Sequence, residues 1–509
     1  MVAKGTNLNI SINGEALKEV QEIKYLGKIV AANNSANSHV NFIIEKTKKT
    51  CRFLNILSGC RFGINPRRAI HLYKAFARSK IEYAASTFAN LSKSALKSIK
   101  TCINTFLRRS LGLIRSTPTQ TLYQLAGELP IELRLELATA KELSKCFAHN
   151  RPICNILTEH NNGLRTSYAK VYEKYANILN NIEAELPTEK VPDNLLVDLN
   201  FFKNSAVNKK GANKETIQQL FQEKINILKS QGFELIFTDG SIGEDSSSSA
   251  FFHPALEHTE AFKINKKLAS MSAELIAIEK AFNYAINKGF SKVAILSDSK
   301  SGAYTLSQGT NNIAKRIHKQ LQSTNTVLSI HFIPSHSGIE ENDKVDLAAK
   351  QALNDGQTLT TPWSRKDAIN EIENKLWKEW DILYWQMSRN TGKAFGKIFP
   401  NVGKKPWFSK QNFKLLPNQI KQINRLLVEH CFCPATLARM GVTENQMCNE
   451  CNTQDSGNHI IFECSKFTRE RTNFPKITNS KDMVDFCKNN GFQQFQHITT
   501  FLEKIKYEL

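Results

Sequence analysis

Apolar side chains between residues 233 and 356 follow two different periods. Short strand-like runs cover Phe233–Thr238, Val293–Leu296 and Val327–Ile333. Helical spacing covers Ala273–Asn287 and Asp343–Leu353. Because strands that alternate with helices build layered sheets, we expect one α/β domain over residues 233–356.

The residues before this domain are mainly helical by the same criterion. Apolar side chains recur at helical spacing from Ile99 to Leu107. Two prolines and then an amphipathic helix at Lys214–Leu228 are typical of a connecting segment. We therefore expect a helical domain at residues 1–185 and a connector at residues 186–232.

The residues after the α/β domain combine a long charged helix with a cysteine-rich segment. Residues 357–410 are predicted to form a helical linker, in which indoles recur at Trp377, Trp380 and Trp385. We interpret this indole stripe as part of a hydrophobic core, and a base-stacking platform is the alternative. Residues 411–509 are predicted to form a metal-binding module followed by helices.

The charge balance favours a polyanionic partner. The 509-residue chain has 68 Lys and Arg against 47 Asp and Glu, a formal net charge of +21. Residues 1–150 alone hold 23 basic and 9 acidic side chains, a surplus of 14. Since basic groups near phosphates release condensed counterions, this surplus favours RNA or DNA as a partner of the N-terminal region. A basic surface that only aids solubility is the alternative.

The sequence has no feature of a membrane or secreted protein. No apolar run approaches the roughly 18 residues of a membrane span, and Met1–Asn13 lacks the apolar core of a signal peptide. Five of the 11 cysteines crowd between Cys431 and Cys464, which suits a reducing compartment and a metal site better than a disulfide framework. We expect an intracellular protein without a membrane partner, and the nucleus and the cytoplasm both stay open.

Four carboxylates lie where predicted strands end or predicted helices begin. Asp239 ends the first strand, and Gly240 would permit a sharp exit of the chain. Asp298 follows the next strand, Glu274 lies in the first turn of one helix, and Asp346 lies near the start of another. Each acid alone has an ordinary explanation, as a turn cap or as a complement to a helix dipole.

The combination of the four acids is more informative than any one of them. Two strand ends and two helix starts in one small α/β domain can converge on one edge. Carboxylates gathered there repel one another and cannot all ionise unless cations neutralise them. Because magnesium prefers oxygen ligands, Mg²⁺ is the expected cation.

The segments around these acids resemble type 1 ribonuclease H. The matching segments, in the order of that family, are Thr238–Ser241, Ser272–Leu275, Ser297–Ser299 and Pro334–Gly338, followed by Asn342, Asp346 and Ala348. The resemblance implies a mixed five-stranded sheet with flanking helices. We expect this domain to lie between the mainly α-helical N-terminal domain and a small zinc-containing C-terminal module. It also implies that two Mg²⁺ ions are held by Asp239, Glu274, Asp298 and Asp346, and that His336 has an auxiliary catalytic role.

The activity that this resemblance implies is hydrolysis of the RNA strand of an RNA–DNA hybrid. In a two-metal mechanism one ion activates a water for in-line attack on the phosphate, and the other stabilises the departing 3′ oxygen. Recognition of the hybrid would depend on the shape of its minor groove and on 2′ hydroxyls, which only the RNA strand offers.

Short segments of the N-terminal region resemble the thumb and connection of non-LTR retrotransposon reverse transcriptases. The matching segments are Ile23–Gly27, His39–Val40, Tyr73–Ala75, Ile81–Tyr83, Arg109–Gly112 and Thr117–Pro118. A generic basic helical domain is the alternative. None of these segments is catalytic, and the sequence has no Tyr-x-Asp-Asp motif, so we expect no polymerase activity.

The order of these segments implies the C-terminal part of a longer I-like or Jockey-like polyprotein, or a truncated copy of one. A separate or upstream reverse transcriptase is therefore a further candidate partner of the chain.

The cysteine-rich segment contains the motif Cys448-x2-Cys451-x7-His459-x4-Cys464. Three thiolates and one imidazole suffice for one tetrahedral zinc ion. Cys431 and Cys433 are competing ligands, and free core cysteines are the alternative. The flanking segments also resemble the C-terminal module of the same retroelements, namely Arg425–Leu427, Arg439–Gly441 and Phe462–Phe467. We expect one structural Zn²⁺ that holds a small basic surface for RNA or DNA.

Two further hypotheses stay open beside hybrid cleavage. The chain could be a catalytically silent remnant that binds nucleic acid, or a structural subunit of a retrotransposon complex. All four acids and His336 are present in an uninterrupted sequence, which favours cleavage.

Overall fold

The computed structural model of the chain describes residues 11–16, 20–33, 35–59, 63–87, 91–159, 166–202, 213–409 and 415–507. The chain divides into two compact units. The first unit comprises Met1–Glu142, Asn161–Lys174 and Ile372–Leu509, and the second comprises Leu143–His160 and Tyr175–Glu371. The five domain limits expected from the sequence stay predictions.

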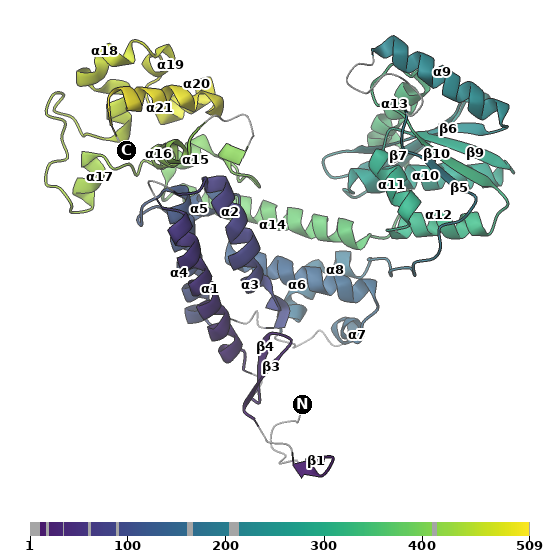
Figure 1. Cartoon of the computed structure of the whole chain (residues 1–509), viewed down its shortest axis with the longest axis horizontal. Helices are drawn as coiled ribbons and strands as arrows, with labels where there is room; N and C mark the ends of the chain where they lie inside the picture. The colour runs from purple at the N-terminus through teal and green to yellow at the C-terminus, as the bar shows by residue number, and fades with distance from the viewer. Residues whose placement is uncertain are drawn as a thin grey trace. The chain divides into compact units, whose positions relative to one another are not determined.

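In the part of the second unit that the structure describes, a seven-stranded sheet has the order β11-β8-β7-β6-β9-β10-β5 (Figure 1). Its strands are β5 (Leu195–Asp198), β6 (Glu234–Ile242), β7 (Ser247–His253), β8 (His258–Ile264), β9 (Lys292–Ser297), β10 (Val327–Phe332) and β11 (Gln357–Thr358). Strands β6, β7 and β8 pair antiparallel, and β6, β9, β10 and β5 pair parallel. The predicted mixed sheet is therefore confirmed.

The predicted number of five strands is wrong, because each edge of the sheet carries one more strand. Strand β5 comes from the predicted connector and pairs with β10, and β11 follows the predicted α/β domain and pairs with β8. Leu195 of β5 is buried in the core of the unit. Strands of four and two residues are too short for their apolar period to be read from the sequence.

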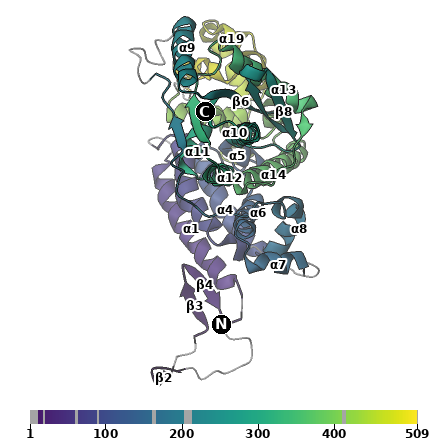
Figure 2. The ribbon, with the colours of Figure 1, turned by 90° about the vertical axis from the view of Figure 1, so that its right-hand side faces the viewer.

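Helices cover both faces of this sheet (Figures 1 and 2). One face carries α10 (Ser270–Asn287), α11 (Lys300–Gln308) and α12 (Asn312–Gln322), and the other carries α9 (Lys214–Ser230) and α13 (Glu340–Asp355). The alternation of side chains along each strand explains the two cores. In β6, Ile236 belongs to the first core, whereas Leu235 and Phe237 belong to the second.

The three helices predicted in this region are confirmed as α9, α10 and α13. Helices α10 and α13 each begin three residues earlier than predicted. Their first residues are mostly polar, so the apolar period alone starts too late.

The first unit is mainly helical. Its helices include α1 (Asn37–Leu57), α4 (Lys93–Leu111), α16 (Pro417–Leu427) and the part of α14 (Arg365–Ser388) from Ile372 onward. Helices α1 and α4 lie side by side (Figures 1 and 2). Helix α16 packs on the end of α4, where the Asn424 amide donates to the Leu111 carbonyl at 3.0 Å. Among the described residues, no helix combines the length and the apolar character needed to cross a membrane.

Segments of the thumb-like resemblance contact one another in this unit. Strands β3 (Glu22–Tyr25) and β4 (Lys28–Ala31) form a hairpin across Leu26 and Gly27, both of which have positive φ. The Tyr83 hydroxyl donates to the Leu26 carbonyl at this turn. Residues far apart in sequence therefore support one hairpin.

The indole stripe is only partly buried. Trp377 and Trp380 are buried as predicted, with 9% and 3% of their surface exposed. The prediction is wrong for Trp385, which is 48% exposed. The Arg389 guanidinium lies 3.6 Å from the centroid of the Trp385 ring, and this contact covers part of the indole from one side.

Candidate functional site

The register of two parallel strands brings Asp239 and Asp298 together. Strand β6 pairs with β9 as far as Thr238 and Ser297. The two acids are the next residue of each chain, so they lie side by side. The prediction that Asp239 ends its strand is wrong, because β7 continues to pair with β6 and holds it extended to Ile242.

Gly240 allows helix α10 to approach strand β6. A Cβ on Gly240 would lie 2.6 Å from the Glu274 nitrogen and 2.7 Å from the Ala273 carbonyl carbon. This glycine therefore serves close packing, and the predicted sharp exit of the chain is not found. Glu274 lies in the second turn of α10, and its predicted place in the first turn is wrong because the helix begins at Ser270.

The start of α10 is held by Asp367, which sequence reasoning missed. One carboxylate oxygen of Asp367 accepts from the Ala269 nitrogen at 2.8 Å. The other accepts from the Ser272 hydroxyl at 2.8 Å and from the Ser364 hydroxyl at 2.6 Å. Ala269 is the N-cap residue and has no acceptor of its own, so Asp367 supplies the cap from 98 positions away.

No sequence pattern around α10 predicts this distant cap. The nearest signal is the Ser364-x2-Asp367 spacing, which is typical of the first turn of the helix on which it lies, α14.

Three of the four predicted acids form one compact group. Asp239, Glu274 and Asp298 each offer a carboxylate oxygen, and these atoms lie within 4.8 Å of one another. Asp239 and Glu274 are only 8% and 5% exposed. The Glu274 Oε2 atom is buried and has no hydrogen-bond partner among the described residues. A buried carboxylate oxygen without a donor favours a cation, so the residues present fit Mg²⁺.

The electrostatics of the group support the same conclusion. Burial raises the pKa of Asp239 to about 6, and the charges of Asp298 and Asp346 add to this shift. Burial and then Asp239 raise the pKa of Glu274 well above its usual range. The pKa of Asp298 is raised by burial and by Asp346, whereas His336 opposes the shift. The three carboxylates therefore resist ionisation until a cation neutralises them.

Asp346 and His336 lie near the group without being part of it. Asp346 lies in the second turn of α13, and its Oδ2 is 2.6 Å from the Lys350 ammonium. His336 lies in the loop between β10 and α13 with φ +51°, and its side chain is exposed. The charge of Asp346 raises the pKa of all three acids, whereas His336 lowers the pKa of Asp298 alone.

The predicted zinc ligands also form one group, in the first unit. Side-chain ligand atoms of Cys448, Cys451, His459 and Cys464 lie within 4.8 Å of one another. The Sγ of Cys464 is 3.8 Å from that of Cys448 and 3.9 Å from that of Cys451. His459 Nε2 is buried without a hydrogen-bond partner among the described residues.

Neighbouring groups orient the His459 ring and shift the pKa values of the cysteine thiols. His459 Nδ1 lies 3.2 Å from the Thr453 hydroxyl, which leaves Nε2 free for the metal. Hydrogen bonds from Ser465 lower the pKa of Cys451 to about 7. Burial raises the pKa of Cys464 to about 12, so this thiol ionises at neutral pH only with a metal ion beside it. The residues present fit Zn²⁺.

The competing cysteines lie outside this group. The Cys433 thiol and burial raise the pKa of Cys431, and the Cys433 sulfur lies 3.4 Å from the Thr436 hydroxyl. Hydrogen bonding with Cys431 lowers the pKa of Cys433 to about 6. The structure therefore favours the four-residue motif over a set that includes either of these cysteines.

Among curated proteins, the chain is similar to a retrovirus-related Pol polyprotein. One such relative is the Pol polyprotein from type-1 retrotransposable element R1 4 of Nasonia vitripennis, which is 24% identical over 176 residues. The alignment covers 33% of this chain and 43% of that protein, so the chain spans less than half of its relative. The predicted resemblance to a non-LTR retrotransposon polyprotein is confirmed. No protein-family model matches the chain.

Two solved structures align with about a quarter of the chain. One is a foamy viral protease-reverse transcriptase in complex with dsDNA, at 21% identity and a TM-score of 0.22, covering 24% of this chain and 94% of that one. The other is ribonuclease H1 from the archaeon Halobacterium salinarum, at 19% identity and a TM-score of 0.20, covering 25% of this chain and 100% of that one.

Proposed function

We propose that the acid group of the second unit is the active site of a magnesium-dependent ribonuclease that cleaves the RNA strand of RNA–DNA hybrids. One observation carries the proposal. Three carboxylates from β6, α10 and the end of β9 converge within 4.8 Å, and Glu274 Oε2 is buried there without a donor among the described residues. The motifs that resemble ribonuclease H, together with the similarity to a retrotransposon Pol polyprotein, support this substrate class.

The side chains of the site have separate roles in this proposal. Asp239, Glu274, Asp298 and Asp346 would hold two Mg²⁺ ions, which supply an activated water and stabilise the departing 3′ oxygen. The exposed His336 would exchange protons at the rim of the site, beside Asp298. Products would carry a 5′ phosphate and a 3′ hydroxyl.

The thiolate group of the first unit would hold one structural Zn²⁺. Cys448, Cys451, His459 and Cys464 present no open position to a substrate when all four bind the ion. Lys466 and Arg469 follow the last ligand and are exposed. This basic surface, like the basic N-terminal region, would bind RNA or DNA.

A separate or upstream reverse transcriptase is the partner that this activity would serve. Hybrid cleavage removes template RNA after first-strand synthesis, and the chain spans 43% of a Pol polyprotein. The competing interpretations are a silent nucleic-acid-binding remnant and a structural subunit of a retrotransposon complex.

The test is a cleavage assay on the full chain with a hybrid whose RNA strand is end-labelled. With Mg²⁺ we expect endonucleolytic products, and with a chelator none. Replacing Asp298 by Asn should reduce the rate by more than about 100-fold, because losing even an outer-shell partner of a metal ligand costs 10- to 100-fold. Asp355→Asn is the matched control, since Asp355 is exposed at the far end of the helix that carries Asp346.

The outcomes separate the hypotheses. Cleavage that survives in Asp298→Asn would show that another site or a contaminant acts. Hybrid binding without cleavage would favour the silent remnant. Cleavage that begins only when a reverse transcriptase is added would favour the structural subunit.

A further inference from the structure

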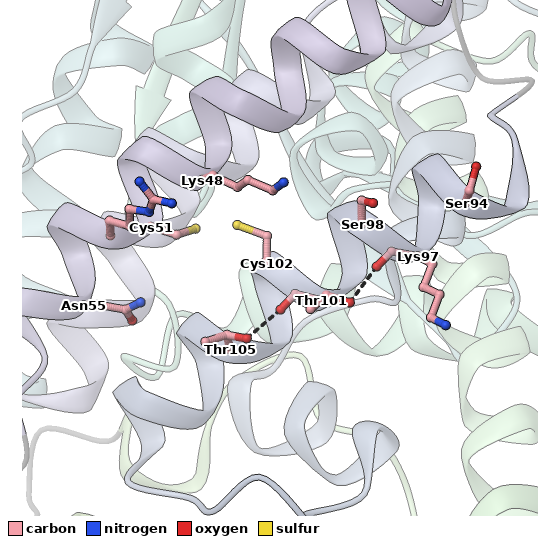
Figure 3. A pocket seen from close by; sticks show the side chains of 10 residues that line it. Lys48, Cys51, Asn55, Ser94, Lys97, Ser98, Thr101, Cys102 and Thr105 are labelled. Carbon is pink, nitrogen blue, oxygen red and sulfur yellow. Dashed lines mark hydrogen bonds between the residues drawn. The ribbon is translucent and has the colours of Figure 1, made fainter.

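A basic pocket lies between α1 and α4 in the first unit, outside both candidate metal sites (Figure 3). Its volume is about 490 Å³. Lys48, Arg52 and Lys97 contribute positive charge to its lining, and none of the ten described residues that line it is acidic. Such a pocket attracts anions of small-ligand size.

Two thiols face each other in this pocket (Figure 3). Cys51 belongs to α1 and Cys102 to α4, and both are free cysteines. Each thiol is the neighbour that most shifts the pKa of the other. Cys51 is buried with 3% of its surface exposed, whereas Cys102 is only partly buried. The packing of the two helices therefore holds a buried thiol against a reachable one.

The surroundings make the two thiols unequal. The neighbouring Cys51 thiol lowers the pKa of Cys102, and the charges of Lys48 and Arg52 act in the same direction. The Cys102 thiol and burial raise the pKa of Cys51. Because the thiolate is the nucleophile, Cys102 is the attacking thiol and Cys51 is placed to react second.

We propose that Cys102 is a modification site for anionic disulfides, and that Cys51 resolves the adduct into a Cys51–Cys102 disulfide. The Cys102 thiolate attacks one sulfur of the reagent, whose S–S bond breaks and releases one thiolate. Cys51 then loses its proton to solvent and attacks the Cys102 sulfur, which releases the second thiolate. The two cysteines lose two electrons and the reagent gains them. The product links α1 covalently to α4.

The reagent charge provides a test that needs no variant. The reduced, zinc-loaded full chain is treated with glutathione disulfide, which is anionic, or with cystamine, a cationic disulfide. Free thiols are then alkylated, and peptides are mapped by mass spectrometry. For each thiol, the rate with the anionic reagent is divided by the rate with the cationic reagent. This ratio should be about tenfold higher for Cys102 than for a small model thiol. Added salt should reduce this preference.

Three variants locate the effect. Lys48→Gln and Arg52→Gln should each reduce the preference for the anionic reagent at Cys102 without changing the rates at Cys146 and Cys487. Cys51→Ser should stop the reaction at a mixed disulfide on Cys102. Equal rates with both reagents, or a stable mixed disulfide in the wild-type chain, would overturn the proposal. None of these measurements depends on nuclease activity.

Discussion

Gly240 and the backbone nitrogen of Glu274 approach each other so closely that no side chain fits between them. A Cβ on residue 240 would lie 2.6 Å from that nitrogen. This contact seats α10 against β6 and sets Glu274 beside Asp239. The geometry of the acid group therefore depends on a residue that has no functional group of its own.

Replacing Gly240 by Ala should displace α10 and weaken the site. The added methyl meets backbone atoms, which cannot rotate away, so we expect a loss of about 1–3 kcal/mol in the free energy of unfolding. Mg²⁺ affinity and hybrid cleavage should fall as well. Thermal unfolding and calorimetric Mg²⁺ titration would measure both effects.

Gly232→Ala is the control for that substitution. Gly232 precedes β6 with φ +80°, and a Cβ there would meet nothing within 4 Å. Backbone strain should cost about 1 kcal/mol without a change in Mg²⁺ affinity. Equal Mg²⁺ affinity in both variants would refute the proposed role of the Gly240 contact.

Without a bound metal ion, the free energy of unfolding should increase as the pH falls from about 7 to about 4, because Asp239 becomes protonated. Burial raises the folded-state pKa of Asp239 from 3.8 to about 6. The folded state therefore holds a proton that the unfolded state releases, and the charged form destabilises the fold above about pH 6. Below pH 3.8, the pKa of Asp239 in the unfolded state, the carboxyl is protonated in both states, so its charge no longer destabilises the fold.

Asp239→Asn should remove that cost. At neutral pH and without Mg²⁺ we expect the free energy of unfolding to rise by about 2 kcal/mol, and its pH dependence between 4 and 6 to flatten. Urea unfolding with a chelator present would measure this, with the exposed Asp355→Asn as the control. A variant with the same pH slope as the wild type would contradict the electrostatic argument.

Removing the distant cap should loosen α10 and the acid that it carries. Asp367→Ala leaves the Ala269 nitrogen and the Ser272 hydroxyl without their acceptor. Loss of an N-cap costs about 1–2 kcal/mol, and we expect Mg²⁺ affinity to fall together with stability.

Asn311→Ala is a matched control for this effect. The Asn311 side chain caps α12 by accepting from the Ala314 nitrogen at 2.8 Å, and α12 carries none of the four acids. This variant should lose similar stability and keep its Mg²⁺ affinity. If both variants changed Mg²⁺ affinity equally, Asp367 would have no special role in positioning Glu274.

Zinc content should distinguish the four-residue motif from the competing cysteines. Cys451→Ser should lower the bound zinc below one ion per chain, because it removes one of four convergent ligands. Cys433→Ser should leave one zinc bound, since Cys433 lies outside the group. Elemental analysis after dialysis would measure both. Zinc loss in Cys433→Ser alone would show that the ligand set is wrong.

Local sequence identified the side chains of both candidate sites. Asp239, Glu274 and Asp298 were found because each lies in a short motif, and the zinc ligands because their spacing is confined to 17 residues, from Cys448 to Cys464. Strands β6, β9 and β10 and helices α9, α10 and α13 were found because burial of one face leaves a periodic apolar pattern. These signals are properties of neighbouring residues.

Only the tertiary structure decided how these pieces meet. The continuation of β6 past Asp239 depends on its partner β7, and the cap of α10 comes from Asp367, 98 positions away. Strand pairing, helix capping and the close approach at Gly240 each join residues that are distant in sequence. The sequence by itself therefore determined which side chains form the candidate sites, and long-range backbone contacts determined where those side chains lie.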